Sequence, residues 1–395
     1  MNQRILIVGA GGNQVEIIRK ARDLGLWTAA MDGDPDARGL PEADAPVVGD
    51  IRDAGAVRHA ARQHKVDGIY PAAELAVEAV ADVAWELDLP GVTPEVAMRV
   101  RNKLAMRETL ALKGGFNPAF RGVHSADEAE TAAQELGLPL IVKPADANAS
   151  KGVTRVDEMG QLAPAFERAH ERTYGSGTVL VETFMEGDEF NVDGLMHDGK
   201  YILGGMTAKE RSAPPNRFDL GIFMPPLEPP EVLQPVQNTV VAALDAIGFR
   251  NGTTHVEVIV TPDGPRIVEM AGRPGGGRIP TDLIPLTYGM DFMADSLRIA
   301  LGQAPQEQRA CERGTAVYWI PAKPGVVRAV EGIDEALALP GVQDIVLNIE
   351  PGDVVEPVID CVTRDKLGYV LADGDTVHDA IATAKRARDL CRIVT

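Results

Sequence analysis

One stretch constrains the fold more than any other: residues 253–274 read TTHVEVIVTPDGPRIVEMAGRP. Two runs in which apolar and polar residues alternate flank a Pro-Asp-Gly turn, a pattern typical of a β-hairpin. With the turn centred on Asp263, residues whose numbers sum to 526 face each other, which pairs Glu257 with Glu269. Since side chains alternate between the faces of a strand, one face is predicted to be polar and the other to be core. The predicted polar face holds His255, Glu257, Ile259, Ile267, Glu269, Ala271 and Arg273, and the predicted core face holds Val256, Val258, Val260, Val268 and Met270.

The facing glutamates require compensation. Two carboxylates directly opposite each other have Cβ atoms roughly 5 Å apart and repel, by on the order of 3 kcal/mol at an effective dielectric constant of about 20. A divalent cation, protonation of one carboxyl or a nearby arginine would compensate, and a solvated strand face is the alternative. Carboxylates without clustered Cys or His favour Mg²⁺ over zinc, with Mn²⁺ as an alternative ion. Since Mg²⁺ takes further ligands from water and phosphates, the pair predicts a bound nucleotide polyphosphate.

The overall charge narrows the choice of partners. The 395 residues include 39 basic and 58 acidic side chains, a formal net charge of −19, which repels nucleic acid and anionic membranes. We therefore expect neither as a partner. The sequence shows no secretory signal pattern and no apolar run of about 18 residues, and we expect a cytoplasmic protein. Cys311, Cys361 and Cys391 match no zinc or redox spacing and are expected to be inert thiols.

The first hundred residues alternate short apolar runs with amphipathic segments, which predicts a doubly wound parallel sheet covered on both sides. The first turn, ILIVGAGGNQ, resembles a dinucleotide fingerprint at Gly9 and Gly11, and Asp32 follows at the distance of a ribose-binding acid. Gln14 stands where the third glycine is required, so a tight strand-to-helix turn is the favoured interpretation. A nicotinamide-dependent oxidoreductase is the corresponding alternative function.

Further along the chain the pattern changes twice. Residues 118–190 contain strand patterns around a helix-like stretch from Gly160 to Arg172, residues 191–272 are β-rich, and the tail mixes strands with a helix over 376–392. These changes predict four units, at 1–112, 113–185, 186–305 and 306–395.

Several residues in these units suit a phosphate site. Lys103 opens the helical stretch RNKLAMRETLALKGG, and Lys143 ends an apolar strand where an ammonium needs an anion. The small residues ADANASKGV that follow can bring backbone N–H groups near phosphate. The segment VLVETFMEGDEF offers free backbone groups for a base, and its acids could bind ribose: Glu182, Glu186, Asp188 and Glu189.

The order of these parts resembles the ATP-grasp superfamily. The matching pieces are NKLAMRETL, LPLIVKPADANASKGV, VLVETFMEGDEF and the paired THVEV and IVEMAGRPGG. The resemblance implies an α/β fold of several domains, with an N-terminal parallel sheet, a mobile lid and a β-rich C-terminal part. The EMAGR pattern, the loop KERSAPPNRFDLGIFMPP (209–226) and the β-rich tail are most similar to the L-amino-acid ligase branch.

The resemblance also implies roles for single residues. Lys103 and Lys143 would contact ATP phosphates, and 145–152 would be the lid loop. The implied nucleotide contacts in the lid and hinge are Ser150, Lys151, Gly152, Glu182, Thr183, Phe184 and Met185, with Glu189 on the ribose. Glu257 and Glu269 would ligate magnesium, and Arg273 would steady an acyl phosphate. One departure is Ala271, where many members carry an asparagine that contacts the metal.

Substrate and catalytic candidates complete the expected site. Glu74 ends a strand of the parallel sheet, where ligands bind, and could hold a substrate ammonium; a solvated acid at a helix N-terminus is the alternative. Lys209 and His255 are candidate catalytic residues beside Arg273, with a structural histidine and a solvated loop lysine as alternatives. Further substrate candidates are Arg211, Gly275, Gly276 and Arg278.

These expectations define an ATP-dependent, ADP-forming carboxylate–amine ligase that works through an acyl phosphate. Its partners would be a small-molecule carboxylate and an amine, one of them an amino acid, and a homodimer is one option for its assembly. The alternatives are a biotin-carboxylase-like or other ATP-grasp ligase and, from other classes, the nicotinamide oxidoreductase or a non-catalytic nucleotide sensor.

Overall fold

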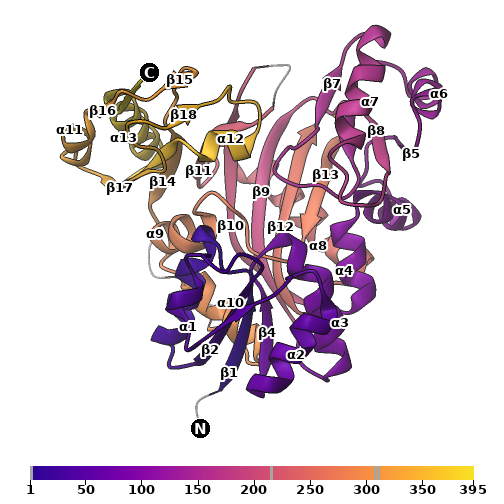
Figure 1. Cartoon of the computed structure of the whole chain (residues 1–395). Coiled ribbons are helices and arrows are strands. Elements are labelled where there is room, and N and C mark those ends of the chain that lie inside the picture. The colour runs from indigo at the N-terminus through magenta and orange to yellow at the C-terminus, as the bar shows by residue number, and fades with distance from the viewer. Residues whose placement is uncertain (1–2, 214–216, 307–308, 310–311) are drawn as a thin grey trace.

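The computed structural model describes residues 3–213, 217–306, 309 and 312–395 (Figure 1). Two sequence expectations fall partly outside these described residues: Cys311, and positions 214–216 of the proline-rich loop.

Four parallel strands form the N-terminal sheet, in the order β3-β2-β1-β4 (Figure 1). Its strands and connecting helices are β1 (Arg4–Val8), α1 (Val15–Asp23), β2 (Trp27–Asp32), β3 (Ala45–Val48), α2 (Ala54–His64), β4 (Gly68–Pro71) and α3 (Val77–Glu86). Side chains of β1 alternate between two cores, with Ile5 and Ile7 on one face and Leu6 and Val8 on the other. The predicted parallel sheet, covered on both faces, is confirmed.

The glycine turn after β1 has a structural explanation. Gly9 has φ +106°, and a Cβ there would lie 2.7 Å from the Cβ of Ala73. Asp32 accepts a hydrogen bond from the Ala10 N–H at 2.7 Å, and the Gln14 side chain donates to the Ala72 carbonyl at 3.2 Å. Gly9 and Asp32, which had suggested a dinucleotide site, therefore hold the turn after β1 against the ends of β4 and β2. This agrees with the tight-turn interpretation.

A second sheet of four antiparallel strands forms the predicted lid, in the order β5-β8-β6-β7. Its elements are β5 (Phe120–Val123), α6 (Ala126–Leu136), β6 (Leu140–Pro144), β7 (Thr154–Val156), α7 (Leu162–His170) and β8 (Val179–Thr183). One face of the sheet packs against α6 and α7 around a core of its own. Strands β6 and β8 carry Lys143 and Glu182, which lie 2.8 Å apart.

The largest sheet is antiparallel and runs in the order β13-β12-β9-β10-β11-β14-β19-β17 (Figure 1). Its strands are β9 (Asp188–His197), β10 (Lys200–Arg211), β11 (Asp219–Met224), β12 (Gly252–Thr261), β13 (Gly264–Ala271), β14 (Gly314–Trp319), β17 (Val342–Leu347) and β19 (Gly368–Gly374). The tail strands β14, β19 and β17 continue the sheet that carries the glutamate hairpin. The strands of the fourth predicted unit thus belong largely to the same sheet as those of the third.

Helices complete these layers. The helices outside the first two sheets are α4 (Pro94–Arg101), α5 (Lys103–Lys113), α8 (Pro230–Ile247), α9 (Ile284–Tyr288), α10 (Phe292–Ala300), α11 (Ile333–Leu337), α12 (Cys361–Asp365) and α13 (Val377–Leu390). Short strands β15 (Gly325–Val326) and β18 (Val354–Val355) pair with each other, as do β16 (Ala329–Glu331) and β20 (Arg392–Val394). Single turns lie at Gly12–Gln14, Leu40–Glu42, Glu74–Ala76, Met159–Gln161 and Ile279–Leu283. Among the described residues, no helix combines the length and apolar composition needed to cross a bilayer.

The hairpin pairs its glutamates as predicted but reaches that register differently. Glu257 lies opposite Glu269. Thr261 pairs with Gly264 across a two-residue turn, so near the turn each residue faces a partner one position earlier than predicted. A β-bulge between Val258 and Glu257 adds one residue to β13 and restores the predicted register. Ile267 consequently lies opposite Val258 in the core, and Val268 is only half-buried. Both assignments made from sequence for Ile267 and Val268 were wrong, because one extra residue reverses the alternation.

Candidate active site

The facing glutamates lie on the same face of the hairpin, each beside a lysine. Lys209 Nζ lies 3.0 Å from Glu257, and Lys103 Nζ lies 3.1 Å from Glu269. Burial raises the pKa of Glu257, but Lys209 and His255 outweigh it and hold that pKa well below the ordinary value. At Glu257 the compensating charge is thus supplied by the ammonium of Lys209. A solvated face is excluded, because the side chains of Glu257 and Glu269 are only 21% and 24% exposed.

The donor set fits a hard divalent cation that shares its ligands with phosphate. No group of three or more His, Cys, Asp or Glu that could hold a metal occurs in the part of the chain that the structure describes. Two carboxylates are nevertheless sufficient for Mg²⁺, which usually keeps water and substrate phosphates as its other ligands. The two ammonium groups supply the neutralising charge in this structure, at the positions where a bound cation would act.

Lys103 owes its position to a helix cap. The Asn102 side chain accepts hydrogen bonds from the Leu104 and Ala105 N–H groups at 2.9 and 3.1 Å, which starts α5 at Lys103. Lys103 also donates through Nζ to the Ala147 carbonyl at 2.6 Å. The lysine therefore joins the glutamate hairpin to the loop predicted as the lid.

Lys143 forms a buried ion pair with Glu182. Its ammonium lies 2.8 Å from Glu182, and both side chains are buried. Glu182 also binds Arg107, with Nε at 2.7 Å. Burial raises the pKa of Glu182, but the charges of Arg107 and Lys143 outweigh it and bring that pKa to about 2. The Glu182 carboxylate is thus occupied with two cations, although the sequence had suggested it as a ribose partner.

The hinge after β8 differs in part from the expectation of free backbone groups. The Thr183 N–H donates to the Ala119 carbonyl at 2.9 Å, and the Phe184 N–H donates to the Pro139 carbonyl at 3.0 Å. These two donors are therefore not available to a base. Two guanidinium groups lie near the Phe184 ring, that of Arg155 at 4.2 Å and that of Arg217 at 5.5 Å from its centroid, and Met185 next to it is half-buried.

The lid loop bends sharply between β6 and β7. Ala149, Ser150 and Gly152 all have positive φ, which turns consecutive backbone groups toward one side. Lys151 donates to the Tyr174 hydroxyl at 2.9 Å. Ser150 lies 4.0 Å from the sulfur of Cys361 in α12, and Cys361 and Cys391 are both free thiols. The lid loop thus reaches the C-terminal part of the chain.

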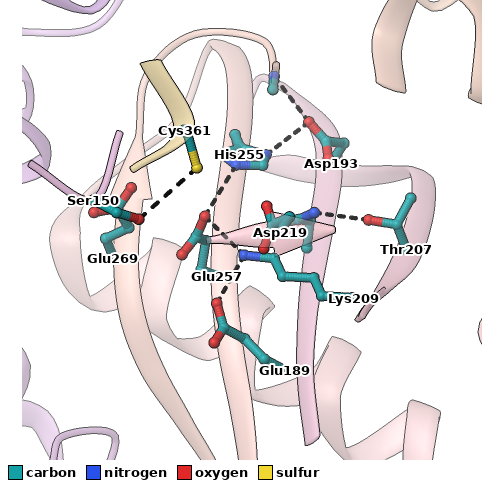
Figure 2. A network of polar contacts seen from close by, with 12 residues as sticks. Ser150, Glu189, Asp193, Thr207, Lys209, Asp219, His255, Glu257, Glu269 and Cys361 are labelled. Carbon is teal, nitrogen blue, oxygen red and sulfur yellow. Dashed lines mark hydrogen bonds and ion pairs between the residues drawn. The ribbon is translucent and has the colours of Figure 1, made fainter. Parts of the chain in front are cut away.

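A line of alternating charges crosses the large sheet (Figure 2). Asp193 contacts His255 at 3.0 Å, His255 lies 3.8 Å from Glu257, and Lys209 joins Glu257 to Glu189, the latter at 2.7 Å. Burial lowers the pKa of His255, but Asp193 outweighs it and raises the pKa to about 9. The alternative interpretation of Lys209 as a solvated loop lysine was wrong, because the residue lies in β10 and its side chain is only 2% exposed.

The outer end of this line is fixed by Arg211. Its guanidinium pairs with Glu189, and its Nη2 donates to the Arg217 carbonyl at 2.9 Å. Glu189 is thus buried between two cations, in the strand next to the hairpin.

Glu74 is neither solvated nor free. Its two oxygens contact Arg101 at 3.1 Å and Arg273 at 2.6 Å, and its side chain is 10% exposed. Burial raises the pKa of Glu74, but Arg273 and Arg101 outweigh it and leave that pKa below the ordinary value. The solvated-acid alternative was therefore wrong, and Glu74 orients the arginine expected at the acyl phosphate.

The glycine loop after Arg273 separates the remaining candidates. The Gly275 N–H donates to Asp193 at 3.0 Å, whereas a Cβ at Gly276 would meet nothing within 4 Å. Arg278 is engaged with Asp282 at 2.6 Å and with the Tyr369 hydroxyl at 3.2 Å. The structure brings Gly275 to the charged line, leaves space at Gly276, and turns Arg278 toward the C-terminal strands.

Three residues of this site were missed by sequence reasoning: Arg101, Arg107 and Asp193. Arg107 lies with Met106 and Leu110 among the buried residues of α5, so a charge on the apolar stripe was a usable signal. Asp193 follows Glu189 at even spacing in β9, which places their side chains on one face.

Two family models match parts of this chain. Residues 136–282 match the model of the ATP-grasp domain, and residues 317–395 match that of the L-amino acid ligase C-terminal domain 2. The uncharacterized protein y4rH of Sinorhizobium fredii is 29% identical over 82% of this chain and 67% of its own length. Dapdiamide A synthase of Enterobacter agglomerans is 27% identical over 75% of this chain and 72% of its own. The crystal structure of an L-amino acid ligase from Bacillus licheniformis, at 23% identity, superimposes with a TM-score of 0.88 over 100% of this chain and 98% of its own.

Fold, family models and relatives define the class: the chain is an ATP-grasp enzyme, an ATP-dependent, ADP-forming ligase that joins a carboxylate to an amine. Within that class it carries an L-amino acid ligase C-terminal domain. The oxidoreductase and the nucleotide sensor considered from sequence are thereby set aside.

Proposed function

We propose that the enzyme activates the carboxylate of an amino acid as an acyl phosphate and transfers the acyl group to the amine of a second small molecule, forming a peptide-like amide. The supporting observation is that Glu257 and Glu269 face each other on the hairpin, beside Lys209 and Lys103 respectively. A similar pair without nearby cations would be a repulsive defect, whereas here it suits an enzyme that binds a metal–triphosphate complex.

In this proposal each charged group has one task. Glu257 and Glu269 hold Mg²⁺, or Mn²⁺ in its place, which when bound neutralises the phosphates. Lys103 and Lys143 contact the nucleotide phosphates, Glu189 the ribose, and the lid loop with Ser150, Lys151 and Gly152 covers the phosphates. Backbone groups of the hinge near Met185 hold the base.

At the acceptor end, the substrate carboxylate attacks the terminal phosphorus of ATP and ADP leaves. Arg273, oriented by Glu74, offsets the negative charge that develops on the acyl phosphate and on the tetrahedral adduct. The amine then attacks the acyl carbon, and inorganic phosphate departs as the leaving group. Lys209, Arg211 and His255 supply positive charge on the same face. Because water competes with the amine, the lid must be closed before the anhydride forms.

The partners in this proposal are small molecules, among them an amino acid that Glu74, Gly276 and Arg278 would help to select. A homodimer is compatible with the scheme, and the cytoplasm supplies its ATP and Mg²⁺.

The test measures ADP and phosphate release across pairs of amino acids. We expect release to require Mg²⁺, a carboxylate and an amine together, with an amide product detected by mass spectrometry. Glu269→Gln should lower kcat/KM by about 100-fold or more, since it removes one of two anionic metal ligands. Wild-type turnover by that variant would disprove the metal assignment. Release that depends on bicarbonate instead would favour biotin-carboxylase-like chemistry.

A further inference from the structure

Arg107 is the largest fully buried side chain of the described residues, with an exposed fraction of 0%. A buried guanidinium is tolerated when its donors are satisfied by well-placed acceptors. Its Nε and Nη2 contact the two oxygens of Glu182 at 2.7 and 3.3 Å. Its Nη1 and Nη2 donate to the carbonyls of Ile267 and Val268 at 2.8 and 2.9 Å. One side chain of α5 therefore connects the nucleotide hinge to the strand that carries Glu269.

The two carbonyl contacts identify the bulge as the feature that Arg107 binds. In a regular strand, successive carbonyls point to opposite edges, so neighbouring residues cannot present both to one group. Ile267 and Val268 do so because the bulge of the hairpin lies there. Since β13 is the edge strand of its sheet, no further strand donates hydrogen bonds to these carbonyls on the outer side.

The position of the bulge decides which way Glu269 points. Between the bulge and the turn, facing residues follow one register, and beyond the bulge they follow the other, in which Glu257 lies opposite Glu269. If the bulge lay beyond Glu269 instead, that residue would face Val256, and its carboxylate would be turned into the core. The contacts of Arg107 favour the arrangement that brings both glutamates to the cleft.

The second half of the Arg107 contact set reaches the nucleotide side. Glu182 binds Arg107 and, at 2.8 Å, Lys143. The ammonium expected at the phosphates and the strand expected to hold the metal are therefore linked through a single buried guanidinium.

We propose that Arg107 is a positioning residue of the nucleotide–metal site: it pins the hairpin bulge so that Glu269 faces Glu257, and it aligns Lys143 through Glu182. This inference rests on the proposed metal role of Glu257 and Glu269. Arg107 itself touches neither substrate nor metal.

The test measures Mn²⁺ binding to the full chain in the presence of ADP, from the electron paramagnetic resonance signal of free Mn²⁺. Arg107→Lys keeps the charge but lacks the planar fork, so it cannot bind Glu182 and both carbonyls together. We expect Mn²⁺ affinity to fall by about 10- to 100-fold, as is typical when a residue that orients a metal ligand is lost. Arg107→Gln serves as a second variant. Wild-type affinity in both variants would overturn the inference.

Two further variants separate positioning from general stability and from the metal assignment. Leu110→Ala removes a fully buried side chain from the same helix and should lower the melting temperature without changing Mn²⁺ affinity. In a Glu269→Gln background, Arg107→Lys should produce a much smaller loss, because its effect passes through Glu269; an undiminished loss would overturn the inference. If Glu269→Gln alone bound Mn²⁺ like the wild type, the proposed function would fail, and the inference with it.

Discussion

The charged side chains of the candidate active site are positioned by ion pairs with one another and not by contact with solvent. Glu182 is the clearest case, because its carboxylate lies between Arg107 and Lys143 and both cations are buried with it. Removing one partner of such a group leaves the others buried and uncompensated, which typically costs about 3–5 kcal/mol.

Glu182→Gln should therefore destabilise the protein at neutral pH by about 3 kcal/mol or more. The pKa of Glu182 is lowered from 4.5 to about 2 in the folded chain. A group whose folded pKa is depressed contributes stability above its unfolded pKa and loses it as the pH falls through the folded value. The difference in urea midpoint between wild type and variant should thus be full above about pH 5 and shrink toward pH 2. A difference independent of pH in this range would contradict the assigned ion pairs.

Elements were easier to predict than their irregularities. The strand and helix pattern of the first hundred residues predicted the parallel sheet, and alternation around one turn predicted that Glu257 faces Glu269. The bulge was not predicted, because a single extra residue has no periodicity of its own. Arg107 was missed for a different reason: its partners lie 75 and 160 residues further along the chain, at a distance no local pattern reports.

The turn after β1 gives a prediction for an element. Gly9→Ala places a Cβ 2.7 Å from that of Ala73 and keeps a φ of +106°, so we expect a loss of about 1–3 kcal/mol. The loss is measured as the change in the free energy of unfolding obtained from amide hydrogen exchange of residues in β1 and β4. Gly25→Ala is the matched control, since its φ is also positive while a Cβ there meets nothing within 4 Å. Equal losses in the two variants would show that contact with Ala73 is unimportant.

At the scale of the whole molecule, a polar contact between Ser150 and Cys361 at 4.0 Å joins the lid loop to α12. An enzyme of this class must open its lid to admit nucleotide and close it for chemistry. The contact between Ser150 and Cys361 offers a place at which this movement can be arrested.

Ser150→Cys should form a disulfide with Cys361 under oxidising conditions and hold the lid against α12. We expect ADP release to fall by more than about tenfold on oxidation and to recover with dithiothreitol, because nucleotide exchange requires the lid to open. Adding Cys361→Ala to the variant should abolish the response to oxidation. Full activity of the cross-linked protein, verified by mass spectrometry, would show that lid opening near Ser150 is not needed for turnover.

The eight-stranded sheet has a consequence for how such enzymes diversify. Strand β14 pairs with β11, with Ile222 opposite Val317, and β19 and β17 follow it in the same sheet. The C-terminal part is therefore joined to the rest of the enzyme by backbone hydrogen bonds and not only by a linker. A chimera that takes its C-terminal part from a related enzyme must therefore preserve the pairing of β11 with β14. If that pairing is lost, the exposed edge strand is expected to cause aggregation.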